Sequence, residues 1–391
     1  MTMTVVSASL LTSGSTNRFS VLQHHQDRSF RLEKDSSNKY AVVDVGDLLL
    51  HAQKGKTREV RTVLVNALRR DGFCFITTPK GSRVSTIIHN IRKSMSTLFA
   101  KAGQRNDEHL QTSDLVYVSE KGVPMYRLGY ELCEDGVREM FRVAAGCPDE
   151  HQVWPSSSSS SSCLRNGGGL EGSVRSTWLR ALGMMRHVCD TALDLVLYDD
   201  EADSADGWMR PEKRRVERPH SYFWTQNNLS SVMRDRVGDF SVLYAMHYFN
   251  NTEKGGSEDD SSDEFLDPAP TSSSKLPPGI AVKAHVDPSV LVLEPFLCQE
   301  TTGLQVWDRE RGDWMDCDGP NSPAASLWEK QLEVMLLFVG KAMTTATESS
   351  SSCSSAPIEP TLHRVVTGDR PRRTVIYEQK YEEFYSAPAL D

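Results

Sequence analysis

Long hydrophobic runs and an excess of basic residues are both missing from this chain of 391 residues. A membrane-spanning helix needs roughly 18 or more consecutive apolar residues, and no segment approaches that length. Lys and Arg number 44 against 53 Asp and Glu, which gives a formal net charge of -9. Because binding to nucleic acid requires a basic surface, we expect neither a membrane nor a nucleic acid as a partner.

Paired cysteines are absent as well. The eight cysteines are scattered and form no C-x-x-C pair, which argues against a disulfide framework or a zinc cluster and favours reduced thiols in an intracellular protein. The first 26 residues contain no acid, yet they lack the basic start of a secretory signal. We therefore expect a cytoplasmic monomer, with an organelle transit segment at the N-terminus as the alternative.

Low-complexity stretches divide the chain. Residues 156–162 are seven serines in a row, 349–355 are again rich in serine, and 251–279 contain seven acids and two lysines, so this segment carries -5 of the -9 charge. Such stretches bury too little apolar surface to fold by themselves. We interpret all three as surface insertions, and the remaining chain of roughly 300 residues suits one catalytic fold.

The spacing of apolar residues changes along the chain. Apolar stripes with helical spacing predict helices over 60–68, 84–100 and 174–197, with short strands near 40–45 and 73–76. From residue 240 onward the period is that of strands, which we expect over 241–249, 281–286, 290–293, 304–307, 334–339, 363–366 and 374–377. Helices first and strands after indicate an α+β protein whose C-terminal half is a sandwich or barrel.

Three residues in the strand-rich half could bind a metal. His285 and Asp287 are two apart on an expected strand, so their side chains share a face, and His363 could add a third ligand from across the sheet. Two histidines and one carboxylate suit Fe(II) that must also bind a co-substrate and O2. An H-x-D triplet alone occurs about once by chance in a chain of this size, so a hydrogen-bonded surface pair is the alternative.

A second pair follows the third candidate ligand. Arg372 and Thr374 also share a strand face, and a guanidinium with a hydroxyl could hold a carboxylate. Taken separately, an arginine such as Arg372 is more often a solvent-exposed charge on a strand. Because Arg372 and Thr374 occur together with the His-Asp-His set, we favour the interpretation that they bind a carboxylate.

These motifs, in this order, resemble the isopenicillin N synthase-like family of iron(II)- and 2-oxoglutarate-dependent dioxygenases. The resemblance extends from about residue 40 to 385. It rests on several short sequence motifs, and their order and spacing together are more specific than any single motif. They are YAVVDVGDL at 40–48, ALRRDGFCFIT at 67–77, REMFRV at 138–143, AHVD at 284–287, GLQVWDRERGDW at 303–314, FVGKAM at 338–343, LHRVV at 362–366 and RRT at 372–374.

The resemblance implies a double-stranded β-helix, or jelly roll, with an N-terminal helical and mixed accessory region. It predicts a disordered leader over 1–38, the accessory region over 39–155, a Ser/Gly-rich linker over 156–172 and helical support over 173–235. The catalytic jelly roll is expected over 236–385, with a disordered acidic insert at 251–279.

The same resemblance assigns roles to individual residues. It places Fe(II) on His285, Asp287 and His363, and the far carboxylate of 2-oxoglutarate on Arg372 and Thr374. Tyr248 matches a tyrosine that the family often uses against that carboxylate. No catalytic residue is expected beyond the metal ligands.

The activity implied is oxidation of a small organic molecule by O2, through hydroxylation, desaturation or ring closure, with formation of succinate and CO2. Two alternatives remain open: an oxidase of the same fold that uses no 2-oxoglutarate, and a non-catalytic jelly-roll binding protein. Arg372 and Thr374 argue against the first alternative, and the intact His-Asp-His set argues against the second.

Overall fold

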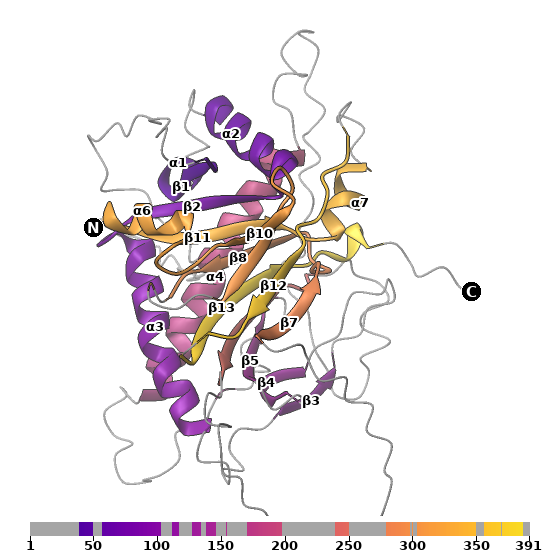
Figure 1. Ribbon diagram of the computed structural model, residues 1–391. Coiled ribbons are helices and arrows are strands. Elements are labelled where there is room, and N and C mark those ends of the chain that lie inside the picture. Colours follow the sequence, from indigo (N-terminus) through magenta and orange to yellow (C-terminus); the bar gives the residue numbers. More distant parts are fainter. Residues whose placement is uncertain are drawn as a thin grey trace, which may run out of the picture. The chain divides into compact units, whose positions relative to one another are not determined.

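Two β-sheets of unequal size carry the candidate site, and helices cover the larger sheet (Figure 1). All of the described elements belong to one unit of the chain, residues 36–391. The computed structural model describes residues 39–49, 57–102, 112–116, 127–133, 138–145, 154, 170–197, 239–249, 279–297, 299, 303–348, 356–368 and 370–385.

The N-terminal half alternates strands and helices. Its elements are β1 (Val42–Asp44), α1 (Val45–Leu49), α2 (Thr57–Arg70), β2 (Phe73–Pro79), α3 (Arg83–Ala102), β3 (Thr112–Val116), β4 (Arg127–Leu132), β5 (Arg138–Ala144) and α4 (Leu170–Leu197). Gly72 ends α2 with a φ of 85°, a left-handed conformation that glycine adopts without steric cost. Its amide donates to the carbonyl of Ala67, which closes the end of the helix that the sequence predicts over 60–68.

The C-terminal half is mostly strands. Its elements are β6 (Val242–Tyr248), β7 (Ile280–His285), β8 (Leu291–Pro295), β9 (Leu304–Asp308), β10 (Asp313–Asp316), α6 (Pro323–Glu329), β11 (Leu332–Val339), α7 (Ala342–Glu348), β12 (His363–Val366), β13 (Arg372–Gln379) and the 3-10 turn η3 (Glu382–Phe384). The large sheet has the order β1-β2-β11-β8-β13-β6-β5-β4-β3, and the small sheet has the order β10-β9-β12-β7. From β6 to β13 the chain passes back and forth between the two sheets.

This mixture of sheets and helices agrees with the predicted α+β class. The prediction that helices come first and strands after is wrong in part. Besides β1 and β2, which were expected near 40–45 and 73–76, strands β3, β4 and β5 lie in the N-terminal half and extend the large sheet beyond β6. β5 pairs with β6 along its whole length, and its residues Phe141 and Val143 are buried in the core. The apolar alternation of this seven-residue strand is too short to predict a strand from periodicity alone.

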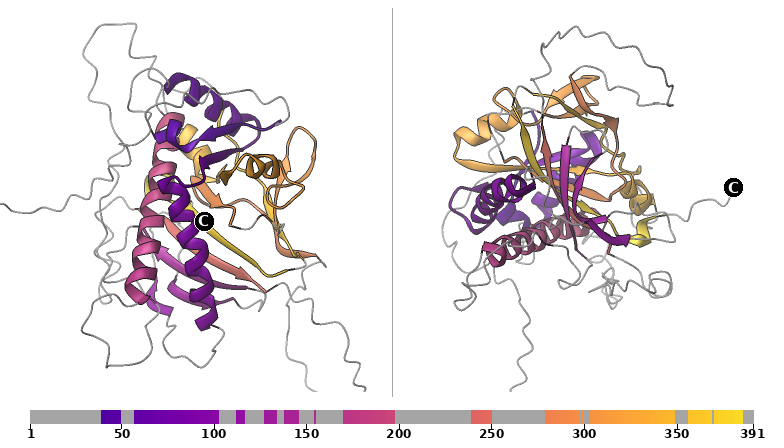
Figure 2. Two further views of the ribbon diagram at one scale, coloured as in Figure 1. Left: turned by 90° about the vertical axis from the view of Figure 1, so that its left-hand side faces the viewer. Right: turned by 90° about the horizontal axis from the view of Figure 1, so that it is seen from below.

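Two apolar layers surround the large sheet. Helices α3 and α4 contact each other and lie side by side in Figure 2. Helix α4 also packs on β8 and β13. Leu291 and Leu293 of β8 belong to the layer that includes these helices. Because side chains alternate along a strand, Val292 points the other way, into a layer formed with residues of both sheets such as Val306 and Phe338. The candidate site lies on this second side of β8.

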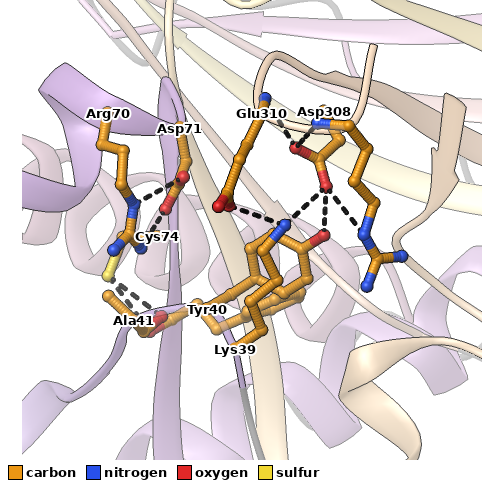
Figure 3. Close-up of polar contacts among 10 residues, drawn as sticks. Lys39, Tyr40, Ala41, Arg70, Asp71, Cys74, Asp308 and Glu310 are labelled. Carbon is orange, nitrogen blue, oxygen red and sulfur yellow. Dashed lines mark hydrogen bonds and ion pairs between the residues drawn. The ribbon is translucent and has the colours of Figure 1, made fainter. Parts of the chain in front are cut away.

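The start of the described chain is tied to the turn after β9 (Figure 3). Tyr40 donates its hydroxyl to Asp308 Oδ2 at 2.7 Å, and Lys39 Nζ lies 3.2 Å from the same carboxylate and 2.8 Å from Glu310. Burial opposes ionisation of Asp308, but these donors and the Arg311 amide hold its pKa below the ordinary value. The contact joins the segment just before β1 to strand β9 of the small sheet.

Several features predicted from composition fall partly outside the described residues. The leader at 1–38 and both serine-rich stretches are outside them, as is the acidic segment except Gly279. Among the described residues, Cys74, Cys189 and Cys317 are buried free thiols. No helix among the described residues is long and apolar enough to cross a membrane.

Candidate metal and co-substrate site

His285, Asp287 and His363 come together at the end of β7 and the start of β12. His285 is the last residue of β7, and His363 lies opposite it in the antiparallel pairing of β7 with β12. Asp287 follows β7 by two residues, and its two carboxylate oxygens lie 3.4 Å from His285 Nε2 and 3.5 Å from His363 Nε2. One possible ligand atom from each residue lies within 4.8 Å of the other two.

Backbone carbonyls determine which nitrogen of each imidazole is available. His285 Nδ1 lies 2.8 Å from the carbonyl oxygen of Lys283, and His363 Nδ1 lies 3.2 Å from that of Thr361. A carbonyl can only accept a hydrogen bond, so Nδ1 must donate in both rings. Each neutral ring therefore has its lone pair on Nε2, directed at the cluster, which is the arrangement seen for metal-binding histidines.

The electrostatics of the cluster favour an ionised carboxylate. Burial opposes ionisation of Asp287, but His363, His285 and the Lys380 ammonium lower its pKa below the ordinary value. Burial lowers the pKa of His363, which keeps that ring neutral. Burial acts in the same direction on His285, but the Asp287 carboxylate outweighs it and raises the pKa of His285.

The three candidate ligands differ in how far solvent reaches them. The side chain of His285 is 40% exposed, whereas those of Asp287 and His363 are 12% and 6% exposed. The His363 ring packs on Phe338 of β11 at a centroid distance of 4.9 Å. A ligand would therefore enter from the side of His285.

Arg372, Thr374 and Tyr248 lie together on the paired strands β13 and β6. Arg372 pairs with Tyr248 in the antiparallel register, and its Cζ lies 5.8 Å from the centroid of the tyrosine ring. The Tyr248 hydroxyl donates to Met246 Sδ at 3.3 Å, and burial raises the pKa of Tyr248. The structure thus gathers the three residues predicted for 2-oxoglutarate.

Two carboxylates beside Arg372 were not assigned from the sequence. Glu294 Oε1 accepts from Arg372 Nη2 at 2.6 Å and from Thr374 Oγ1 at 2.5 Å. Asp318 Oδ2 lies 3.1 Å from Arg372 Nη2. The sequence does contain a signal for Glu294. This residue ends the apolar string LVLE at 291–294, and the alternation of side chains along a strand places it on the same face as Val292.

A buried lysine near the cluster was also missed. Lys380 is fully buried and forms an ion pair with Glu378. Tyr244 donates its hydroxyl to the same carboxylate at 3.4 Å. Burial raises the pKa of Glu378, and the Asp287 charge adds to this effect while Lys380 counters it. Lys380 therefore acts on two carboxylates: it forms an ion pair with Glu378 and lowers the pKa of Asp287.

No protein-family model and no curated protein sequence matches this chain. Among solved structures, dioxygenase for auxin oxidation 1 from Arabidopsis thaliana, in complex with 2-oxoglutarate, is 11% identical with a TM-score of 0.50. The match covers 89% of this chain and 93% of that one. The chain has the fold of this dioxygenase. The resemblance drawn from the motifs is thus confirmed at the level of the fold.

Two further structures are similar over comparable lengths. A Neurospora crassa protein, in complex with alpha-KG and thymine, is 12% identical with a TM-score of 0.48, and the match covers 88% of this chain and 86% of that one. The rice dioxygenase for auxin oxidation is 14% identical with a TM-score of 0.45, and the match covers 87% of this chain and 82% of that one.

Proposed function

We propose that the protein is an Fe(II)- and 2-oxoglutarate-dependent dioxygenase that oxidises a small organic molecule and releases succinate and CO2. The observation that carries the proposal is the cluster of His285, Asp287 and His363, with both imidazoles oriented by backbone carbonyls. The dioxygenase fold supports it.

The donor set fits Fe(II). Two neutral imidazoles and one carboxylate occupy three ligand positions and leave others for a co-substrate and O2. Bound Fe(II) would supply activation of O2 and oxidation of a substrate C–H bond. The protein's part is to hold three ligands in place, keep Asp287 ionised, and leave one side of the site open beside His285.

The co-substrate residues fit 2-oxoglutarate in type and position. Arg372 and Thr374 are both buried on the inner face of β13, and a guanidinium with a neighbouring hydroxyl is suited to a carboxylate. Tyr248 packs against Arg372. We assign these three residues to the distal carboxylate of 2-oxoglutarate.

The strand order supports the finer description of the fold. Strands β6 to β13 alternate between the two sheets, except that β9 and β10 form a hairpin within the small sheet, and this passage between two sheets is that of a jelly roll. We infer a double-stranded β-helix over 236–385, with residues 39–155 as an accessory region whose strands join the large sheet. The reaction outcome, whether hydroxylation, desaturation or ring closure, depends on the substrate bound.

One observation favours the second candidate, an oxidase of this fold that uses no 2-oxoglutarate. Arg372 already has two carboxylate partners within the protein, Glu294 and Asp318. Such an enzyme would bind Fe(II) at the same three residues and would require no 2-oxo acid.

The test is anaerobic addition of Fe(II) and then 2-oxoglutarate to the metal-free protein. We expect one Fe(II) per chain and a visible absorption band when 2-oxoglutarate is added. His285→Ala should abolish both, whereas His247→Ala should preserve both, because His247 pairs with Glu139 away from the cluster. Full iron binding by His285→Ala would refute the metal assignment. Iron binding without the band would favour the oxidase.

A further inference from the structure

A carboxylate of the protein itself occupies the position proposed for the distal carboxylate of 2-oxoglutarate. Arg372 Nη2 and Thr374 Oγ1 both donate to Glu294 Oε1, at 2.6 Å and 2.5 Å. These are the two donors assigned to the co-substrate. In the absence of a ligand, their hydrogen bonds are already made within the chain.

A second carboxylate completes the environment of Arg372. Asp318 Oδ2 accepts from Arg372 Nη2 and Nε at 3.1 and 3.2 Å. Asp318 Oδ1 accepts the backbone amides of Gly303 and Leu304 at 2.9 and 3.1 Å, which anchors this carboxylate to the start of β9. One guanidinium thus faces two acidic groups before any ligand is present.

The backbone of Glu294 cannot move away to admit a ligand. β8 lies between β11 and β13 in the large sheet, and Glu294 pairs with Leu336 of β11. Glu294 is 1% exposed, Thr374 is 2% exposed and Arg372 is 4% exposed. Rotation of the Glu294 side chain would release the two donors, but the displaced carboxylate would then be buried without these partners.

Binding of the distal carboxylate of 2-oxoglutarate therefore costs free energy in either of two ways. The carboxylate must share one guanidinium with two carboxylates, where like charges repel, or it must displace Glu294, which is costly for a buried charge that loses its partner. A 2-oxo acid without a distal carboxylate neither shares the guanidinium nor displaces Glu294, so its binding incurs neither cost.

We propose that Glu294 is a specificity-determining residue, an internal competitor that weakens binding of 2-oxoglutarate by occupying Arg372 and Thr374. This inference rests on the proposed function, since it concerns the co-substrate of the same site. Glu294 thereby sets how much the distal carboxylate of a 2-oxo acid contributes to binding.

The experiment compares 2-oxoglutarate with 2-oxobutyrate, which lacks the distal carboxylate. Both are titrated into Mn(II)-loaded protein, and dissociation constants are measured by calorimetry. In the wild type, we expect 2-oxoglutarate to bind no more tightly than 2-oxobutyrate. Glu294→Gln and Glu294→Leu should each tighten 2-oxoglutarate roughly 10- to 100-fold, as expected for hydrogen bonds to a charged group, and leave 2-oxobutyrate unchanged.

Glu333→Gln is the matched control. Glu333 is a buried glutamate on the neighbouring strand β11 that pairs with Arg92, so its substitution removes the same charge without touching Arg372. It should alter neither dissociation constant. The inference is overturned if the wild type prefers 2-oxoglutarate more than about tenfold, or if the folded Glu294 variants bind it no more tightly than the wild type.

A metal-free arm separates this inference from the proposed function. Glutarate, a dicarboxylate without the keto group, should bind metal-free Glu294→Gln more tightly than the metal-free wild type. Glutarate binding of this kind, combined with failure to bind Mn(II), would support the role of Glu294 and refute the metal assignment. Mn(II) binding without any gain for 2-oxoglutarate or glutarate in the Glu294 variants would refute the inference alone.

Discussion

Thr361 donates its hydroxyl to the carbonyl oxygen of Gly72 at 2.6 Å, and its own carbonyl accepts from Nδ1 of His363. The end of α2 is therefore connected to a candidate metal ligand through one residue. A Cβ at position 72 would lie 2.6 Å from the Thr361 hydroxyl, so this approach requires glycine. The string LRRDGF at 68–73, in the helical part of the chain, supports the orientation of His363.

Removal of the Thr361 hydroxyl should weaken metal binding. In Thr361→Val, the segment before His363 loses its anchor to Gly72, and partners that orient a metal-binding histidine typically contribute about 10- to 100-fold in affinity. We expect a loss near the lower end of this range, measured as the Mn(II) dissociation constant of folded protein. Thr361→Ser keeps the hydroxyl and should retain wild-type affinity. Equal affinity in all three proteins would contradict the connection.

Metal binding should stabilise the protein against heat. A metal that binds only the folded state adds about 2.7 kcal/mol to the free energy of unfolding at a hundredfold excess over its dissociation constant. We expect Mn(II) to raise Tm in the wild type and a chelator to reverse the increase. Asp287→Ala should show no increase, because it removes the carboxylate that lies between the two imidazoles. A full increase in Asp287→Ala would place the metal elsewhere.

Gly303→Ala should disturb co-substrate binding and spare the metal. A Cβ at this position would lie 2.4 Å from Cδ and 2.6 Å from Nε of Arg372, closer than nonbonded atoms approach, so the arginine must move. We expect the dissociation constant for 2-oxoglutarate to change while the Mn(II) affinity stays at the wild-type value. Calorimetric titration of both ligands measures this, and loss of Mn(II) binding would show a wider disturbance than predicted.

The sequence predicted most of the C-terminal half. Strand periodicity after residue 240 located β6 to β9 and β11 to β13. The i, i+2 spacing of His285 and Asp287 predicted that they point the same way, but Asp287 lies two residues beyond the end of β7, so strand alternation is not what brings them together. Register could not be read from periodicity, so the pairing of His285 with His363 required the structure. The contact of Glu294 with Arg372 joins residues 78 apart in sequence. It was not predicted, because the resemblance assigned Arg372 to the carboxylate of 2-oxoglutarate.

Stability in acid should depend on Asp308. Its folded-state pKa is lowered, so its contribution is present above the unfolded-state pKa of about 3.9 and is lost as pH falls through the folded-state value. Asp308→Asn should reduce the free energy of unfolding at neutral pH by about 1–3 kcal/mol, because Tyr40 and Lys39 lose a charged acceptor. The difference from wild type, measured by urea unfolding, should shrink below about pH 4. A difference independent of pH would contradict this assignment.

The buried ion pair of Lys380 and Glu378 should affect both stability and the metal site. Lys380→Met leaves Glu378 buried without its cation, which typically costs about 3–5 kcal/mol, and removes a positive charge that lowers the pKa of Asp287. We therefore expect a lower free energy of unfolding and a shift of the pH midpoint of Mn(II) binding to higher pH. Adding Glu378→Gln should restore much of the stability, because no charge is then buried unpaired. If the single and double variants were equally unstable, the loss would come from packing of the lysine side chain and not from the unpaired carboxylate.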